Sequence, residues 1–351
     1  MYGYYSIVQY KNQPMSFRIE IDKSLKTPIY QQISEGILMS IESGALQVGD
    51  LLPSINQVAK ENQVARETVI KSFSSLQERG IVQPVQGKGY FVMTKSVTVK
   101  NRVFFLLDTF SAYKQTFYKG LRDSLGPDSV VDLYFHHFNP KIFQKLVREA
   151  VGNYTHYVVL PFDDERIAEY LKIIPEERLY LTDRYPNFLK NGYSAVFQKF
   201  DDDVFQALTS VGTLIGKYRC LTLVFCDTLT MVPSELKDGF EQFCRVNGVN
   251  YLISCGINAN ENILKGDSFL IIDDDDLVRL VEIANRRGLI IGEDIGIISY
   301  NDTPLKKVVG KGISVISTDF KKMGETIAGL ILNNEQACIQ NPCRFIDRGS
   351  F

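Results

Sequence analysis

The chain of 351 residues lacks the features that mark several large protein classes. No apolar run approaches the roughly 20 residues that a membrane-spanning helix needs. The first residues, MYGYYSIVQYKNQPM, contain no basic segment followed by an apolar core, so they do not form a secretory signal. The formal net charge is -2, and the chain has neither an acidic nor a basic tail. We therefore expect a cytoplasmic protein that does not contact a membrane.

Side chains that bind metals are also scarce. The chain has three histidines, and its six cysteines form neither C-x-x-C nor C-x-x-H. Because the cysteine spacings fit neither a zinc site nor a disulfide framework, we expect reduced, mostly buried thiols, no metal and no cofactor. G-x-S-x-G is absent, and GTLIGKY (Gly212 to Tyr218) has too few residues between its glycines for a phosphate loop. We expect no catalytic residues and no enzyme.

Two different patterns divide the chain, whose 45% hydrophobic residues are enough for a core. From Ile29 to Gly80, short amphipathic helices are predicted. From Arg102 onward, ten apolar strands alternate with amphipathic helices, which is typical of a parallel sheet covered on both faces. The polar stretch from Met93 to Asn101 separates the two patterns.

The segment from Leu51 to Val92 predicts two short helices and a hairpin. Ser54 is a natural N-cap for the first helix. The second helix begins near Ala65, and Val69, Phe73 and Leu76 recur at helical spacing on its inner face. The outward N-terminus of such a helix has the geometry that enters a DNA major groove. The nearly balanced charge of the segment leaves open a helix-turn-helix that only packs against protein.

The same stretch resembles the winged-helix domain of the GntR family of bacterial transcription regulators. The likeness runs without a gap from Thr27 to Val92 and includes G-x-L-x-x-G-D-x-L-P-S, V-x-R-x-T-V and G-x-G-x-F-V. A glycine-rich wing tip lets the backbone approach DNA closely. The helix geometry and the resemblance together imply DNA contacts by Ser54, Asn56, Arg66, Glu67, Thr68, Lys71, Gly87, Lys88 and Gly89.

Polar and aromatic side chains follow several of the later strands. In an open parallel sheet, ligands bind at the carboxyl ends of the strands. Carboxylate and amide groups bind sugar hydroxyls, arginine donates two parallel hydrogen bonds, and aromatic rings cover an apolar sugar face. Loops after strands are usually polar, so any single residue is weak evidence. The candidate effector-binding residues are Asp108, Phe110, Tyr113, Asp183, Arg184, Asp273, Asn301 and Asp302.

The stretch from Gly266 to Leu332 resembles the end of the core domain of the LacI family, which is related to periplasmic sugar-binding proteins. An apolar strand ends in polar residues at Asp273, a helix follows, and then come Gly288-Leu289, Asp294-Ile295 and Asn301-Asp302. The resemblance implies that Asp273 and Asn301 contact the ligand, with their residue types exchanged relative to the family. A GntR-like domain joined to a LacI-like domain is similar to the architecture of the arabinose-repressor family.

Four consecutive aspartates, Asp273 to Asp276, could form a metal cluster, but we interpret them as a ligand contact followed by a helix start. Asp273 would meet the ligand, and Asp274 would support the loop or cap the helix. Asp275 and Asp276 would lie in the first turn, where the helix dipole favours negative charge by about 0.3–1 kcal/mol each.

The predicted fold class is α/β, with an N-terminal winged helix-turn-helix and a two-lobed parallel domain like the periplasmic binding proteins. We predict a flexible extension at 1–16, the winged helix at 17–95, a linker at 96–101, and an effector-binding and dimerisation domain at 102–351. The predicted function is a homodimeric, ligand-responsive repressor that binds double-stranded operator DNA and is controlled by a sugar or sugar derivative. The alternatives are a GntR-type regulator whose second domain only dimerises, or a solute-binding receptor.

Overall fold

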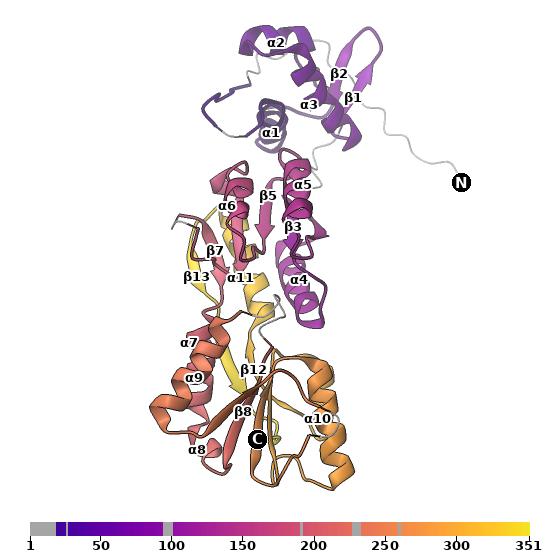
Figure 1. Cartoon of the computed structure of the whole chain (residues 1–351). Coiled ribbons are helices and arrows are strands. Elements are labelled where there is room, and N and C mark those ends of the chain that lie inside the picture. The colour runs from indigo at the N-terminus through magenta and orange to yellow at the C-terminus, as the bar shows by residue number, and fades with distance from the viewer. Residues whose placement is uncertain (1–18, 26, 94–100, 190–191, 227–232, 259–260) are drawn as a thin grey trace, which may run out of the picture.

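The computed structural model describes residues 19–25, 27–93, 101–189, 192–226, 233–258 and 261–351. They form a winged-helix domain above a two-lobed α/β domain, which confirms the predicted fold class (Figure 1). The predicted extension 1–16 and residues 96–100 of the predicted linker lie outside the described residues. Asn101, the last residue of that linker, already begins strand β3, so the α/β domain starts one residue earlier than predicted.

The winged-helix domain follows the predicted order. It contains α1 (Ile29–Glu42), α2 (Ile55–Asn62), α3 (Arg66–Glu78), β1 (Val82–Val85) and β2 (Gly89–Val92), and the two strands pair antiparallel. The hydroxyl of Ser54 accepts a hydrogen bond from the Gln57 amide, so Ser54 caps α2 as predicted. Val69, Phe73 and Leu76 of α3 are fully buried, which confirms the predicted inner face.

The first lobe, here called the N-lobe, is a sheet in the order β13-β7-β6-β5-β3-β4. Helices α4 and α11 pack on one face and α5 and α6 on the other, and each face has its own apolar cluster. The elements are β3 (Asn101–Leu107), α4 (Ala112–Leu125), β4 (Ser129–Phe135), α5 (Pro140–Ala150), β5 (His156–Val159), α6 (Arg166–Leu171), the 3-10 helix η1 (Glu176–Arg178), β6 (Leu179–Asp183), β7 (Ser194–Phe197), α11 (Phe320–Asn333) and β13 (Cys338–Gln340).

The second lobe, here called the C-lobe, repeats this layering with the order β14-β12-β11-β10-β8-β9. Helices α7, α8 and α9 cover one face and α10 the other. The elements are α7 (Phe200–Ser210), α8 (Gly212–Ile215), β8 (Cys220–Val224), α9 (Glu235–Asn247), β9 (Tyr251–Ser254), β10 (Asp267–Ile271), α10 (Asp274–Arg287), β11 (Gly296–Tyr300), the 3-10 helix η2 (Leu305–Lys307), β12 (Ser314–Thr318) and β14 (Cys343–Ile346).

The chain passes between the lobes after β7, after β12 and between β13 and β14. The ten strands predicted after Arg102 are all present. Strands β13 and β14 were not predicted, because they are short and most of their residues are exposed or half-buried. Within the described residues, no helix is both long and apolar enough to cross a membrane.

The cysteine expectation was wrong for one pair, and it was wrong on burial, because only Cys244 of the six cysteines is buried. Cys226 and Cys255 form a disulfide, whereas Cys220, Cys244, Cys338 and Cys343 are free thiols. The two bonded cysteines follow β8 and β9, which are parallel neighbours, so the sheet places their Cα atoms 4.3 Å apart. Sequence spacing alone could not reveal this, since 29 residues separate the two cysteines.

Candidate functional site

The N-terminus of α3 and the hairpin tip form an exposed surface on the winged helix. Arg66 and Glu67 are exposed and Thr68 is half-buried in the first turn of α3, whose N-cap is Ala65. Ser54 and Asn56 are exposed at the start of α2. The hairpin tip, with Gly87, Lys88 and Gly89, is also exposed.

The backbone conformation of the hairpin tip favours glycine at positions 87 and 89. Gly87 and Gly89 have φ angles of +75° and +114°, which favour glycine. A Cβ on Gly89 would also lie 3.0 Å from the Leu51 side chain. These glycines are therefore required by the hairpin itself, whatever the hairpin contacts.

Lys71 stands apart from the other predicted DNA contacts. Its ammonium lies 3.9 Å from the centroid of the Tyr30 ring, a cation–π contact between α3 and α1. It lines a cavity between the winged helix and the N-lobe together with Tyr30, Glu35 and Gly152. Its role in DNA binding stays a prediction, and its position links α3 to the domain interface.

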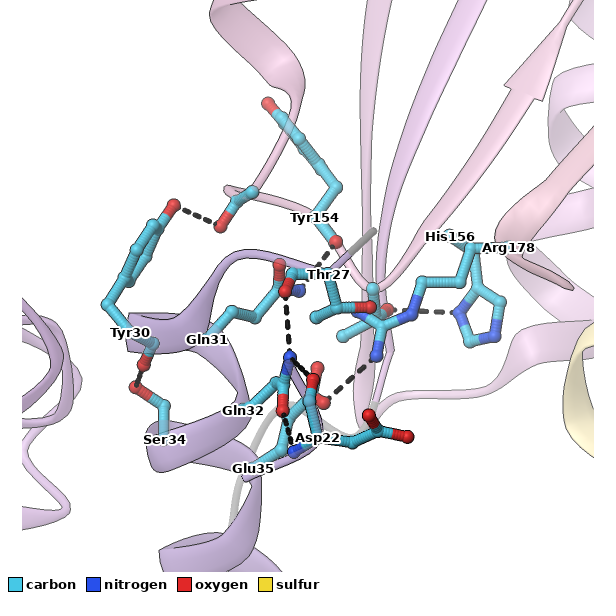
Figure 2. A network of polar contacts seen from close by, with 12 residues as sticks. Asp22, Thr27, Tyr30, Gln31, Gln32, Ser34, Glu35, Tyr154, His156 and Arg178 are labelled. Carbon is cyan, nitrogen blue, oxygen red and sulfur yellow. Dashed lines mark hydrogen bonds and ion pairs between the residues drawn. The ribbon is translucent and has the colours of Figure 1, made fainter. Parts of the chain in front are cut away.

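The winged helix docks on the N-lobe through polar contacts of α1 (Figure 2). The Tyr30 hydroxyl donates to the Gly152 carbonyl at 2.5 Å, and the buried Gln31 amide donates to the Tyr154 carbonyl at 3.0 Å. Glu35 pairs with Arg178 at 2.9 Å. We call these contacts the docking interface. This interface was not predicted from the sequence, because its partners lie more than 120 residues apart.

Gly152 fits the docking interface closely. Its φ angle is +88°, and a Cβ there would lie only 2.5 Å from the Tyr30 hydroxyl oxygen. His156, beside Arg178, is also buried. Burial, followed by the positive charge of Arg178, lowers the pKa of His156 to about 4, so the imidazole is neutral at pH 7.

A cavity of about 280 Å³ lies between the two lobes, at the carboxyl ends of their strands. Six of the eight predicted effector residues line this cleft: Asp108, Tyr113, Asp183, Arg184, Asp273 and Asn301. The cleft is also lined by Lys114, Gln198, Phe200, Phe225, Asp274, Asp276, Tyr300, Lys306 and Phe320.

Phe110 and Asp302 do not line the cleft. Phe110 is 63% exposed and lines a groove beside β4 instead, with its ring edge toward Phe135. The Asp302 carboxylate pairs with Arg348 at 2.8 Å, and its backbone amide donates to Ser317. Asp302 thus ties the end of β11 to β12 and to the chain terminus. Both predictions fail on geometry, because neighbours of a cleft residue need not point the same way.

On the N-lobe side, two buried cations each pair with a carboxylate. Lys114 forms an ion pair with Asp108, and both side chains are almost fully buried. Burial alone would lower the pKa of Lys114, but Tyr113 and the carboxylates of Asp108 and Asp183 outweigh it, so the pKa is raised. Arg184 pairs with Asp163 at 3.5 Å. The sequence did not single out Lys114, although it stands only six residues after Asp108.

Asp183 and Asn301 occupy matching positions in the two lobes. Each lies where a strand meets the cleft, and their φ angles are +67° and +60°. Backbone in this region costs a residue with a side chain about 1–3 kcal/mol and is concentrated at ligand sites. Burial raises the pKa of Asp183, and the nearby cations Lys114 and Arg184 partly offset that effect.

Three buried side-chain atoms lining the cleft have no hydrogen-bond partner among the described residues. They are Oε1 of Gln198, the hydroxyl of Tyr300 and Oδ1 of Asn301. Gln198 is held by donating its amide to Asp183. A buried polar atom without a partner costs about 1–3 kcal/mol. These three atoms are therefore positioned to bond a molecule that enters the cleft.

Lys306 holds the C-lobe side of the cleft. Its buried ammonium donates to the carbonyls of Tyr300 and Asn301 at 2.7 and 2.8 Å and pairs with Asp274 at 2.8 Å. Burial lowers the pKa of Lys306, while Asp274 acts in the opposite direction. The sequence did not identify Lys306.

Asp275 and Asp276 lie in the first turn of α10 as predicted, and Asp273 lines the cleft, but the helix cap differs from the prediction. Asp273, and not Asp274, caps α10: its Oδ1 accepts from the amides of Asp275 and Asp276. Asp274 is the first helical residue and pairs with Lys306, and Asp276 accepts from the Ile257 amide. Across the described part of the chain, no three His, Cys, Asp or Glu side chains are grouped to hold a metal ion.

Comparison with known proteins supports the division into a winged helix and a two-lobed α/β domain. Residues 29–92 match the model of the bacterial regulatory proteins of the gntR family, and residues 228–351 match the periplasmic binding protein-like domain. The chain joins a gntR-family winged helix to a periplasmic-binding-protein-like domain. The resemblances that the sequence motifs suggested are thereby confirmed.

The curated relatives described next match less than a quarter of the chain. The transcriptional repressor YtrA of Bacillus subtilis is 31% identical over 80 residues, which are 23% of this chain and 62% of YtrA. The Bacillus subtilis repressor NagR is 35% identical over 74 residues, which are 21% of this chain and 30% of NagR. The chain thus spans less than two thirds of the length of these relatives.

Solved structures match the α/β domain. The trehalose repressor of Escherichia coli covers 70% of this chain and 99% of its own, with a TM-score of 0.60 and 12% identity. The complex of the regulator CelR with cellobiose covers 85% of this chain and all of its own, with a TM-score of 0.58 and 14% identity. At these identities the likeness establishes the two-lobed fold.

Proposed function

We propose that this protein is a cytoplasmic, homodimeric transcription repressor that binds operator DNA through its winged helix and is released by a small effector in the cleft. The observation that carries the proposal is the joining of a gntR-family domain to a two-lobed domain whose cleft contains buried polar atoms without partners. Similar winged helices occur in proteins named as repressors, and similar two-lobed domains in sugar-bound regulators.

The exposed start of α3 supports the DNA-binding part. Arg66 is exposed at its first position, next to Glu67 and near the glycine-rich hairpin tip. An arginine at this end of a recognition helix can bond a guanine edge with two hydrogen bonds, worth about 1–3 kcal/mol. Ser54, Asn56, Thr68 and the hairpin tip would contact phosphates and sugars, which fix the helix in register.

Binding-site selection from a random DNA pool, followed by a mobility shift at fixed salt, tests this part. Arg66→Ala should weaken binding about 10- to 100-fold. Arg245→Ala, which removes an exposed arginine from α9 in the C-lobe, is the control and should leave binding unchanged. Equal affinities for wild type and Arg66→Ala would remove Arg66 from the interface.

The cleft supports an uncharged, polyhydroxylated effector. Its lining contains five aspartates (Asp108, Asp183, Asp273, Asp274 and Asp276) but only three cationic side chains (Lys114, Arg184 and Lys306). Each of these cations already has a carboxylate partner. A phosphate or carboxylate would therefore enter a site whose lining carries more carboxylates than cations.

The remaining cleft features agree with a sugar. The unpartnered oxygens of Gln198, Tyr300 and Asn301 can accept hydrogen bonds from hydroxyls. Tyr113, Phe200, Phe225 and Phe320 supply apolar surface for a sugar ring. A volume of about 280 Å³ is at the lower limit of the roughly 300–1,000 Å³ typical of ligand pockets, which suits a single ring.

A thermal-shift panel of pentoses, hexoses, their phosphates and sugar acids tests the effector, since a ligand of the folded state raises the melting temperature. We expect uncharged sugars to bind and their phosphates not to. Tyr300→Phe should weaken the binding of the best sugar about tenfold, whereas Tyr218→Phe, outside the cleft, should not change it. If no compound in the panel binds, the second domain serves dimerisation alone.

Control by the effector follows from linkage. If a bound sugar weakens operator affinity by some factor, then operator DNA weakens sugar affinity by the same factor. Closure of the lobes around the sugar would change the position of the two winged helices of a dimer relative to a two-fold symmetric operator.

A further inference from the structure

Two neighbouring strands of the N-lobe run from the docking interface to the cleft. Strand β6 begins directly after Arg178, which pairs with Glu35, and ends at Asp183 in the cleft. Strand β5 begins two residues after Tyr154, whose carbonyl binds Gln31. The strands are parallel, with Tyr157 opposite Leu179, and every residue in both is buried.

The cleft ends of the two strands are also tied together. Asp163, which follows β5, pairs with Arg184, which follows β6, at 3.5 Å. Asp183, the last residue of β6, directly precedes Arg184 and has a positive φ angle. A group with a strained conformation at a ligand site can change its conformation when a ligand alters its contacts.

The distance between the two ends is short. At a rise of about 3.3 Å per residue, Arg178 and Asp183 are about 17 Å apart. Buried, close-packed strands are stiff, so a displacement at one end is passed on and not absorbed. A short 3-10 helix, η1, precedes β6, and Arg178 is its last residue. A movement of β6 along its own direction therefore acts directly on the Arg178 side chain.

We propose that β5 and β6 couple the cleft to the winged helix, with Glu35 and Arg178 as the positioning pair through which the state of the cleft reaches the DNA-binding domain. This inference rests on the proposed function and names the route of its regulation. The side chains of Arg178 and Glu35 are only 18% and 25% exposed, so water screens their interaction less than that of a surface pair. Nη1 of Arg178 has no partner among the described residues, which leaves Glu35 as the carboxylate that orients this guanidinium.

A double-mutant cycle on operator affinity tests the coupling without knowledge of the effector. The changes are Asp183→Asn in the cleft and Glu35→Gln at the docking interface, both nearly isosteric. Changes more than about 7–10 Å apart with no shared partner usually add in free energy. If β6 couples the two sites, the operator affinity of the double variant should differ at least about threefold from the value expected when the two single fold-changes are multiplied.

A matched control uses Glu241 of α9. Its side chain is 26% exposed and pairs with Arg245 at 3.7 Å, so it resembles Glu35 but lies in the C-lobe. For Asp183→Asn and Glu241→Gln, the fold-changes in operator affinity should multiply to within about twofold, as expected for independent sites. Melting curves for every variant establish that it is folded, and Arg178→Lys replaces Glu35→Gln if the latter does not fold.

The outcomes separate the two proposals. If the cycle with Glu35 multiplies as closely as the control cycle, the coupling route is wrong while DNA binding and effector binding stand. If the wild-type protein selects no sequence from the DNA pool, the proposed function is wrong and the coupling falls with it.

Discussion

The strands of the N-lobe sheet begin near the docking interface and end near the cleft. These two ends of the strands, here called the docking edge and the cleft edge, are built differently. At the docking interface, the polar groups of Tyr30, Gln31 and Glu35 meet partners in the N-lobe. At the cleft, Gln198 follows β7 of the N-lobe, and Tyr300 and Asn301 border the same cleft from the C-lobe. One polar atom of each lacks a partner among the described residues. One edge joins two parts of the chain, and the other keeps buried polar atoms without partners among the described residues.

The histidines at the two edges give the largest expected effect. His136, after β4, is buried, donates from Nε2 to the Leu160 carbonyl and stacks on Phe162. Its pKa is lowered to about 4, mainly by burial. His156 has a similar pKa at the docking edge. Between pH 6.5 and 4 the unfolded chain binds protons that the folded chain does not, so stability falls as the pH falls. The loss is about 1.4 kcal/mol per pH unit for each histidine.

Urea unfolding followed by circular dichroism between pH 4.5 and 7 measures this slope. His156→Gln and His136→Gln should each reduce the dependence of unfolding free energy on pH by about 1.4 kcal/mol per pH unit, which corresponds to one proton. If the two variants change the slope by very different amounts, the edges are not equally closed to protons. An unchanged slope in both would mean that these histidines titrate normally.

A pair of glycine variants gives the next largest effect. Gly152 at the docking interface and Gly126 after α4 have φ angles of +88° and +80°, but only Gly152 would place a Cβ against Tyr30. Each change to alanine should cost about 1–3 kcal/mol, because residues with a side chain rarely adopt these backbone conformations. Gly152→Ala should cost more, and it should speed hydrogen exchange in α1. If Gly126→Ala has the same effect on α1, the contact between Gly152 and Tyr30 does not hold the winged helix.

Two tyrosine variants give the smallest effect and contrast the edges directly. Tyr30→Phe removes a hydrogen bond and should destabilise the protein by about 1 kcal/mol. Tyr300→Phe removes a buried hydroxyl that has no partner among the described residues, so in the absence of ligand it should be neutral or slightly stabilising. Chemical denaturation of the ligand-free protein measures both. A loss of stability in Tyr300→Phe equal to that in Tyr30→Phe would mean that the cleft hydroxyl is already bonded.

Local patterns in the sequence were sufficient for much of this architecture. Helical spacing identified the inner face of α3, and apolar runs identified ten strands, because both signals depend on near neighbours in the chain. The carboxyl ends of those strands supplied six residues of the cleft. Gln198 and Tyr300 lie at the ends of β7 and β11, and Lys114 and Lys306 lie in the segments after β3 and β11. None of these four was singled out, because polar and aromatic residues are common at such positions.

Contacts between distant segments could not be predicted in the same way. The docking interface pairs residues from two domains, and the disulfide pairs cysteines from neighbouring strands. Asp273 was expected to meet the ligand and Asp274 to cap the helix, but the start of α10 was one residue earlier than assumed. A shift of one residue at a helix start reassigns every side chain in the first turn.

Hydrogen exchange of α1 with and without a sugar tests the link between the two edges most directly. The sugar is the uncharged compound with the largest thermal shift, and the amides followed are those from Gln31 to Glu35. We predict that the sugar changes their exchange rates at least severalfold, although they lie at the opposite edge of the sheet, and that Glu35→Gln reduces this change. Changes confined to residues that line the cleft would contradict the account.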